Sequence, residues 1–203
     1  MPQIVALGEC MVELSAEGPL AQAEVLHRAY GGDTLNVLVA AARLGSTVGY
    51  ITRIGDDPFA PFLLASWRKE GIDTSQVKVV EGPNGLYIIA SGAAGRRDFL
   101  YYRKGSAAST LSPQDLDETY LAGAQVLHLS GITQAISESA RRTALAAAQL
   151  AHRLGVAVSY DINFRPRLWS AAQAREAFEE LLPYLRICLP SVPGDSQPLF
   201  GLE

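Results

Sequence analysis

The sequence has little of several features that mark common protein classes. Its 203 residues include two cysteines, Cys10 and Cys188, which lie far apart and form no CxxC or metal-ligand pattern. A net charge of -4 argues against nucleic acid as a partner, because such proteins usually carry a basic patch. No apolar run approaches the roughly 20 residues that span a membrane, and the start lacks the basic segment of a signal peptide. These absences predict a cytoplasmic protein that binds neither nucleic acid nor membrane.

Several catalytic signatures are missing as well. The sequence has no Ser-His-Asp or HExxH arrangement, no Walker A loop and no Rossmann GxGxxG segment. Their absence largely removes hydrolases, metalloproteases and dehydrogenases from consideration. His128 stands between Leu127 and Leu129 in a predicted strand, so we expect a core histidine rather than a base. Cys188, in another predicted strand, is expected to be a buried, small apolar residue.

The chain does have ample material for a core, with 48% hydrophobic and 19% charged residues. Asp33 or Thr34 is expected to cap a helix that Gly45 ends, and Ser137 to cap an Ala-rich helix that Gly155 ends. Strands and helices alternate, which predicts an α/β fold with a Rossmann-like parallel sheet flanked by helices. The predicted strands are 3–7, 48–54, 126–130, 156–161 and 186–190, and the predicted helices are about 34–44, 59–70, 137–154 and 170–182.

Two β segments interrupt this alternation. Residues 10–30 are typical of short, half-exposed strands, and residues 85–91 and 98–103 of a hairpin around the turn 92–95. We expect them to form a small β lid inserted into one domain of residues 1–203. Ligands of such folds bind outside the carboxyl ends of the parallel strands, so the lid is expected to lie over those ends. The polar strand ends are 130–132, 161–165 and 191–195.

The first candidate binding motif is the glycine pair Gly31-Gly32 in front of a predicted helix. Glycine lets the backbone approach a ligand closely, and a helix N-terminus offers free amide groups to ligand oxygens. Asn36 lies in the first turn, where its amide can reach the same ligand. A glycine pair alone is more often a plain turn, but this spacing together with the later motifs favours a binding site.

The second motif, Tyr101-Tyr102-Arg103-Lys104, ends the predicted hairpin. Alternation along a strand places Tyr101 and Arg103 on one face and Tyr102 on the other. Because a guanidinium binds a carboxylate through two parallel hydrogen bonds, Arg103 suits an acidic ligand. The alternative is a solvated basic edge, which loses weight because Tyr87 on the paired strand can face the same side.

The third motif is the segment Asp161-Ile162-Asn163-Phe164-Arg165-Pro166, directly after a predicted strand. Pro166 favours extended geometry at Arg165, which would project that side chain over the strand ends. A cation there can contact a carboxylate or a transferring phosphoryl group. The alternative is an Arg–Asp pair that only stiffens the loop.

Taken together, these motifs resemble the ribokinase/phosphofructokinase-B family of carbohydrate kinases over almost the whole chain. Within that family, the segments 85–87, 101–107 and 128–132 are similar to 2-keto-3-deoxygluconate kinases. The family-wide matches are Gly31-Gly32-x-x-x-Asn36 with 41–45, then 53–59, and Asp161-x-Asn163-x-Arg165 with Leu168-Trp169.

The resemblance implies a Rossmann-like kinase domain with a β lid, and ATP and Mg²⁺ as co-substrates. The phosphoryl group would go to the sugar-acid hydroxyl farthest from the carboxylate. Residues implied to bind the sugar acid are Gly32, Asp33, Thr34, Leu35, Asn36, Tyr87, Tyr101, Tyr102, Arg103 and Arg165. Residues implied to lie near the ATP phosphates are Asn163, Phe164, Arg165 and Asp195.

The sequence departs from the family pattern near residue 195. The family's Asn or Ser three residues before a Glu is damaged in either of two alignments: one places Asp195 at the Glu position with Val192 as its partner, and the other places Gly194 there with Ser191. Pro193 and Pro198 would also disturb the helix expected there. The family's Gly-Ala-Gly-Asp segment, which supplies the anion hole and the catalytic base, is absent from these residues. We therefore expect a C-terminally incomplete kinase that holds a sugar acid but is inactive alone.

Two other functions stay open on the sequence. One is a non-catalytic sugar-acid-binding or interaction module derived from such a kinase. The other is a fructokinase-like enzyme for a neutral sugar, for which Arg103 would matter little. We also expect an unpaired, apolar sheet edge near 186–190, and a homo-oligomer formed through that edge or through the lid.

Overall fold

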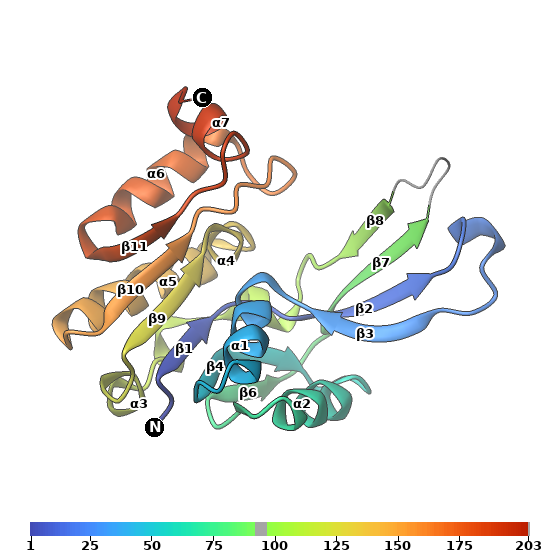
Figure 1. The fold of residues 1–203 in the computed structure, drawn as a ribbon. Helices are drawn as coiled ribbons and strands as arrows, with labels where there is room; N and C mark the ends of the chain where they lie inside the picture. The colour runs from blue at the N-terminus through green and yellow to red at the C-terminus, as the bar shows by residue number, and fades with distance from the viewer. Residues whose placement is uncertain (92–96, 203) are drawn as a thin grey trace.

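A computed structural model describes residues 1–91 and 97–202 of the chain (Figure 1). Its larger sheet has seven strands in the order β11-β10-β9-β1-β4-β5, with β6 also paired to β4. The pairs in this sheet are parallel, which confirms the expected α/β fold. The strands are β1 (Ile4–Leu7), β4 (Val48–Gly55), β5 (Ile72–Asp73), β6 (Val77–Val80), β9 (Val126–Ser130), β10 (Ala157–Asp161) and β11 (Leu185–Leu189).

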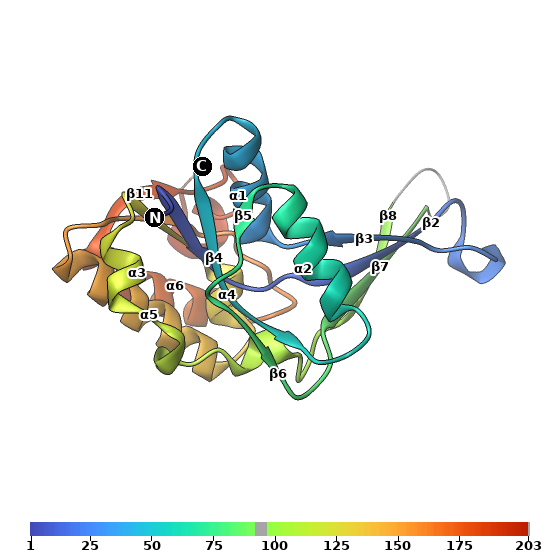
Figure 2. The same ribbon diagram turned by 90° about the horizontal axis from the view of Figure 1, so that it is seen from below.

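Helices cover both faces of this sheet, as Figure 2 shows from below. Successive strand residues point to opposite faces. In β1, Val5 and Leu7 pack toward α5, whereas Ala6 packs toward α1 and α2, so the sheet separates two hydrophobic cores. The helices are α1 (Asp33–Arg43), α2 (Ala60–Lys69), α3 (Glu118–Ala122), α4 (Gly131–Ala135), α5 (Glu138–Arg153), α6 (Ala171–Leu181) and α7 (Ser196–Phe200).

Most helix ends lie where the sequence predicts them. The Ser137 side chain accepts a hydrogen bond from the Ala140 amide at the start of α5, and Gly155 follows that helix with a φ of 74°. The expected cap of α1 is wrong, because Gly32 is the N-cap and Asp33 is already helical. A Cβ on Gly32 would lie 2.2 Å from the Glu9 carbonyl oxygen, so close packing of the backbone selects glycine there.

A second, four-stranded sheet extends away from the first (Figure 1). Its order is β3-β2-β7-β8, with β2 and β7 parallel and both outer pairs antiparallel. We call it the lid sheet; its strands are β2 (Met11–Ala16), β3 (His27–Gly31), β7 (Gly85–Ser91) and β8 (Arg97–Tyr102). Arg28 stacks on the Phe62 ring of α2 at 3.9 Å, which ties the base of the lid sheet to the larger sheet's helices. The turn predicted at 92–95 lies outside the described residues.

The expectation of a buried Cys188 is wrong. The residue is exposed because β11 is the end strand of the larger sheet. Its neighbours Ile187 and Leu189 are 41% and 48% exposed, so this edge is apolar, and no other described strand pairs with it. Over residues 1–91 and 97–202, the helices are too short or too polar to cross a membrane.

Candidate functional site

The polar rim of the larger sheet lies at the carboxyl ends of β9 and β10. Ser130 ends β9, and its hydroxyl donates a hydrogen bond to the Asp33 carboxylate at the start of α1. The same hydroxyl accepts a bond from the Ile132 amide at 3.1 Å, which begins α4. The starts of α1 and α4 therefore meet at the carboxyl end of β9, the side of a parallel sheet where ligands bind.

Asp161, at the end of β10, is the most perturbed carboxyl group of this rim. Burial raises the pKa of Asp161 to about 6, with further contributions from the negative charges of Asp33 and Asp195. Carboxylates that crowd together disfavour one another's ionised form. The rim is therefore acidic, and one of its carboxyl groups takes up a proton in mildly acidic solution.

The glycine pair and the first turn of α1 border the rim, but their roles differ. Thr34 and Leu35 are fully buried in the core, so only their backbone amides can serve a ligand. The Asn36 side chain is exposed. A Cβ on Gly31 would lie 2.4 Å from the Tyr87 hydroxyl oxygen, so this glycine makes room for a lid residue.

The lid sheet presents a row of aromatic rings on one face. Tyr87 of β7 and Tyr101 of β8 are cross-strand partners, and their rings stack with centroids 5.9 Å apart. Phe99 continues the stack, 6.1 Å from Tyr101. This confirms the expected common face of Tyr87 and Tyr101. Tyr102 pairs with Leu86 on the opposite face, so the structure does not bring it together with these rings.

Arg103 follows β8 at the point where the lid sheet joins the larger sheet. Its Nη2 forms an ion pair with the Glu9 carboxylate, which also accepts a hydrogen bond from the Ser106 hydroxyl at 2.9 Å. The Glu9 side chain is 2% exposed and that of Arg103 is 14% exposed. Burial raises the pKa of Glu9, although the positive charge of Arg103 and the Ser106 bond act against the increase.

The loop after β10 carries the residues expected near a phosphate. Arg165 is exposed there, and Asn163 adopts a φ of 42°, a left-handed conformation that asparagine tolerates. The amide of Phe164 donates to Asp195 Oδ1 at 2.7 Å. Asp195 also accepts bonds from the Ser191 amide and hydroxyl, both at 2.7 Å, so its carboxylate joins the loops after β10 and β11.

The loop after β10 has some of the groups that bind the phosphates of a nucleotide. A phosphate group needs cationic or amide donors, and the exposed guanidinium of Arg165 with the side-chain amide of Asn163 fits that need. The Asp195 carboxylate is already bonded to three protein donors. Within the described part of the chain, no three His, Cys, Asp or Glu residues gather closely enough to hold a metal ion.

Sequence reasoning missed Glu9 and Glu13 as functional candidates. Glu9 pairs with Arg103, and Glu13 accepts a hydrogen bond from the Tyr87 hydroxyl. A signal for Glu9 exists, because a carboxylate two residues after the apolar strand 4–7 has to find a partner when it is buried. The core role expected for His128 is confirmed: the ring is 4% exposed and its Nδ1 lies 3.2 Å from Ser159 Oγ.

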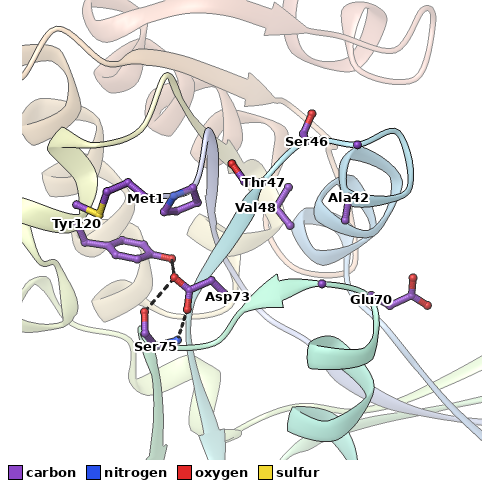
Figure 3. A pocket seen from close by; sticks show the side chains of 12 residues that line it. Met1, Ala42, Ser46, Thr47, Val48, Glu70, Asp73, Ser75 and Tyr120 are labelled. Atoms are coloured by element: carbon purple, nitrogen blue, oxygen red, sulfur yellow. Dashed lines mark hydrogen bonds between the residues drawn. The ribbon is translucent and has the colours of Figure 1, made fainter.

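Two surface cavities lie away from these residues. One of about 530 Å³ is at the amino ends of β1 and β4, opposite the polar rim (Figure 3). There Tyr120 donates a hydrogen bond to Asp73, which Ser75 also contacts. The other, of about 690 Å³, lies beside α2 and is lined by residues between 56 and 79. Neither cavity is lined by a residue implied to bind the sugar acid or the ATP phosphates. The first includes Ala42 and Gly45, and the second includes 56–58, which belong to the family-like segments.

Comparisons with known proteins agree with the geometry. A 2-dehydro-3-deoxygluconokinase of Thermoproteus tenax is 37% identical over 209 residues, covering 100% of this chain and 63% of that protein. The 2-dehydro-3-deoxygluconokinase of Dickeya dadantii is 39% identical, covering 98% of this chain and 65% of its own length. The crystal structure of a Thermotoga maritima 2-dehydro-3-deoxygluconokinase superimposes with a TM-score of 0.94 at 27% identity, covering 100% of this chain and 63% of that one.

The chain thus spans just under two thirds of the length of these three proteins. Residues 1–193 match the family described as pfkB family carbohydrate kinase, which is nearly the whole sequence. This chain belongs to the pfkB family of carbohydrate kinases.

Proposed function

We propose that these 203 residues form the sugar-acid-binding part of an ATP-dependent 2-keto-3-deoxygluconate kinase. The observation that carries the proposal is an aromatic face on the lid sheet with a mostly buried arginine at the base of the same sheet. Tyr87 and Tyr101 stack on that face, and Arg103 comes directly after β8, the strand that carries Tyr101. The similar proteins named 2-dehydro-3-deoxygluconokinase act on this same sugar acid by another of its names, which supports the substrate.

Each part of the site has a defined task in this proposal. The guanidinium of Arg103 binds the substrate carboxylate, and the two tyrosine rings pack against the carbon chain. Asn36 and the free amides at the start of α1 bind hydroxyl oxygens at the other end of the sugar. Holding both ends of an extended substrate fixes which hydroxyl group faces the phosphoryl donor.

Mg²⁺-ATP would supply the phosphoryl group, and Asn163 and Arg165 are the residues that would hold its phosphates. An exposed cation beside the acidic rim offsets the negative charge that a phosphate brings. The acceptor hydroxyl also needs a base, and the sequence has no Gly-Ala-Gly-Asp segment to supply it. We therefore propose that the 203 residues bind the sugar acid without phosphorylating it.

Calorimetric titration with 2-keto-3-deoxygluconate tests the binding, and a coupled assay of ADP release tests the lack of turnover. Arg103→Ala is expected to weaken binding of the acid at least tenfold, because a carboxylate loses its charged partner. The control ligand is 3-deoxyfructose, in which a hydroxymethyl group replaces the carboxylate, and its affinity should change less than twofold. Equal losses for both ligands would refute the binding of the carboxylate by Arg103, and tight binding of 3-deoxyfructose with little effect of Arg103→Ala on either ligand would favour a neutral sugar. Sugar-dependent ADP release would refute the lack of turnover.

A further inference from the structure

Glu9 lies where the chain passes between the two sheets. Four connections meet there: residues 8–10, Gly32, residues 81–84 and residues 103–106. We call this region the junction. Glu9 lies close to each of the other three connections: to Gly32, to Gly85 at the end of residues 81–84, and to residues 103 and 106. Its carbonyl oxygen limits the space at Gly32, and its Oε1 lies 3.1 Å from where a Cβ on Gly85 would stand.

The Glu9 carboxylate uses both of its oxygens inside the junction. Oε1 accepts the Ser106 hydroxyl, and Oε2 accepts the Nη2 of Arg103. A guanidinium has five N–H donors, so this ion pair leaves the others for a ligand. Among the described residues, the Nε of Arg103 is buried and has no hydrogen-bond partner. A buried donor without a partner is costly, so a ligand oxygen bonded to this nitrogen would remove that cost.

We propose that Glu9 is a positioning residue, whose carboxylate fixes the Arg103 guanidinium at the junction so that its remaining N–H groups receive the carboxylate of the sugar acid. This inference rests on the proposed sugar-acid site. A free arginine side chain has many rotamers, and ordering it during binding costs affinity. Glu9 orders it beforehand, because a charge-assisted bond in a buried site has little freedom to reorient.

Binding measurements separate this role from a purely structural one. Glu9→Gln keeps the shape of the side chain but removes its charge, and it is expected to weaken 2-keto-3-deoxygluconate binding about tenfold with a less than twofold change for 3-deoxyfructose. Adding Glu9→Gln to Arg103→Met should cause no further loss. The matched control is Ser106→Ala, which removes the neutral partner of the same carboxylate and should change either affinity less than threefold. Equal losses for both ligands, or additive losses in the double variant, would overturn the inference.

A measurement without ligand decides the same point if the wild-type chain binds neither sugar. In ¹⁵N-labelled protein, the Arg103 Nε–H signal is identified by its disappearance in Arg103→Lys. We expect slow exchange with water in the wild type and in Ser106→Ala, and at least tenfold faster exchange in Glu9→Gln. Glu9→Asp, which is one methylene shorter, replaces Glu9→Gln if the latter does not fold. Unchanged exchange would refute the positioning role, whereas absent sugar binding with changed exchange would refute only the proposed substrate.

Discussion

Arg53 belongs to one of the family-like segments, and the structure gives it a purely internal task. Its Nε and Nη2 donate to the two oxygens of Asp115, at 2.7 and 2.9 Å. The Asp115 side chain is 1% exposed. Arg53 also donates to Ser112 Oγ at 3.0 Å, so the arginine fastens the segment around residues 110–115 to β4. We expect Arg53→Met to be among the more destabilising substitutions of a charged residue in this chain.

The burial of Asp115 sets the expected size of the effect. Removing one partner of a buried ion pair typically costs about 3–5 kcal/mol, because the other charge stays buried without compensation. Lys78 remains 2.9 Å from Asp115 and offsets part of that loss. The expected loss in the free energy of unfolding is therefore about 3 kcal/mol. For a domain of this size, that corresponds to a decrease in Tm of roughly 6–12 °C.

Urea denaturation followed by circular dichroism measures this loss, and the chain offers a matched control. Arg43 also makes two hydrogen bonds to a carboxylate, at 2.8 and 2.6 Å to Glu70, but its side chain is 66% exposed. Arg43→Met should therefore cost less than about 1 kcal/mol. If Arg53→Met costs no more than Arg43→Met, burial does not control the strength of these pairs and the reasoning is refuted.

The pH dependence gives a second signature of the same pair. Burial acts to raise the pKa of Asp115, but hydrogen bonds from Arg53 and Lys78 outweigh it and hold the pKa below its usual value of 3.8. A lowered pKa contributes stability above pH 3.8 that is lost as the pH falls through the folded value. The difference between wild type and Arg53→Met should therefore shrink below about pH 4.

Three further predictions follow from the rim, the sheet edge and the junction. Because the pKa of Asp161 is raised in the folded state, its ionisation lowers the stability fully above about pH 6 and not at all well below pH 3.8. In thermal melts, Asp161→Asn should therefore stabilise the protein by about 1 kcal/mol at pH 8 and leave its stability unchanged at pH 3. Light scattering should detect concentration-dependent association through the β11 edge, reduced by Leu189→Lys; a monodisperse wild-type monomer would contradict this. Gly32→Ala should cost about 1–3 kcal/mol and weaken acid binding, whereas Gly45→Ala, strained only by its φ of 93°, should leave acid binding unchanged in calorimetry.

The regular elements of the larger sheet could be predicted because their signals are local. A serine before α5 and a glycine after it mark that helix on the sequence, and β9 has the bounds that its apolar run predicts. The elements that were missed, β5, β6, α3, α4 and α7, have two to five residues each, too few for a period to be recognised. The exposure of Cys188 follows from the open sheet edge predicted near 186–190, whereas the burial expected for this cysteine rested on its residue type alone.

The motifs of the candidate site can be recognised in the sequence, but the contacts between the motifs cannot. Gly31 makes room for the Tyr87 hydroxyl, and Gly32 makes room for the backbone of Glu9, which in turn pairs with Arg103. The glycine pair and the Tyr-Tyr-Arg segment are therefore parts of one packed unit, although they lie far apart in the sequence. A ligand at the rim and close packing at the junction select the same glycines, so sequence pattern alone cannot separate the two causes. Glu9 shows that close packing is one of the two causes, because its backbone fills the space beside Gly32. The burial of Glu9 depends on four connections that lie far apart in the sequence, so only the structure reveals it.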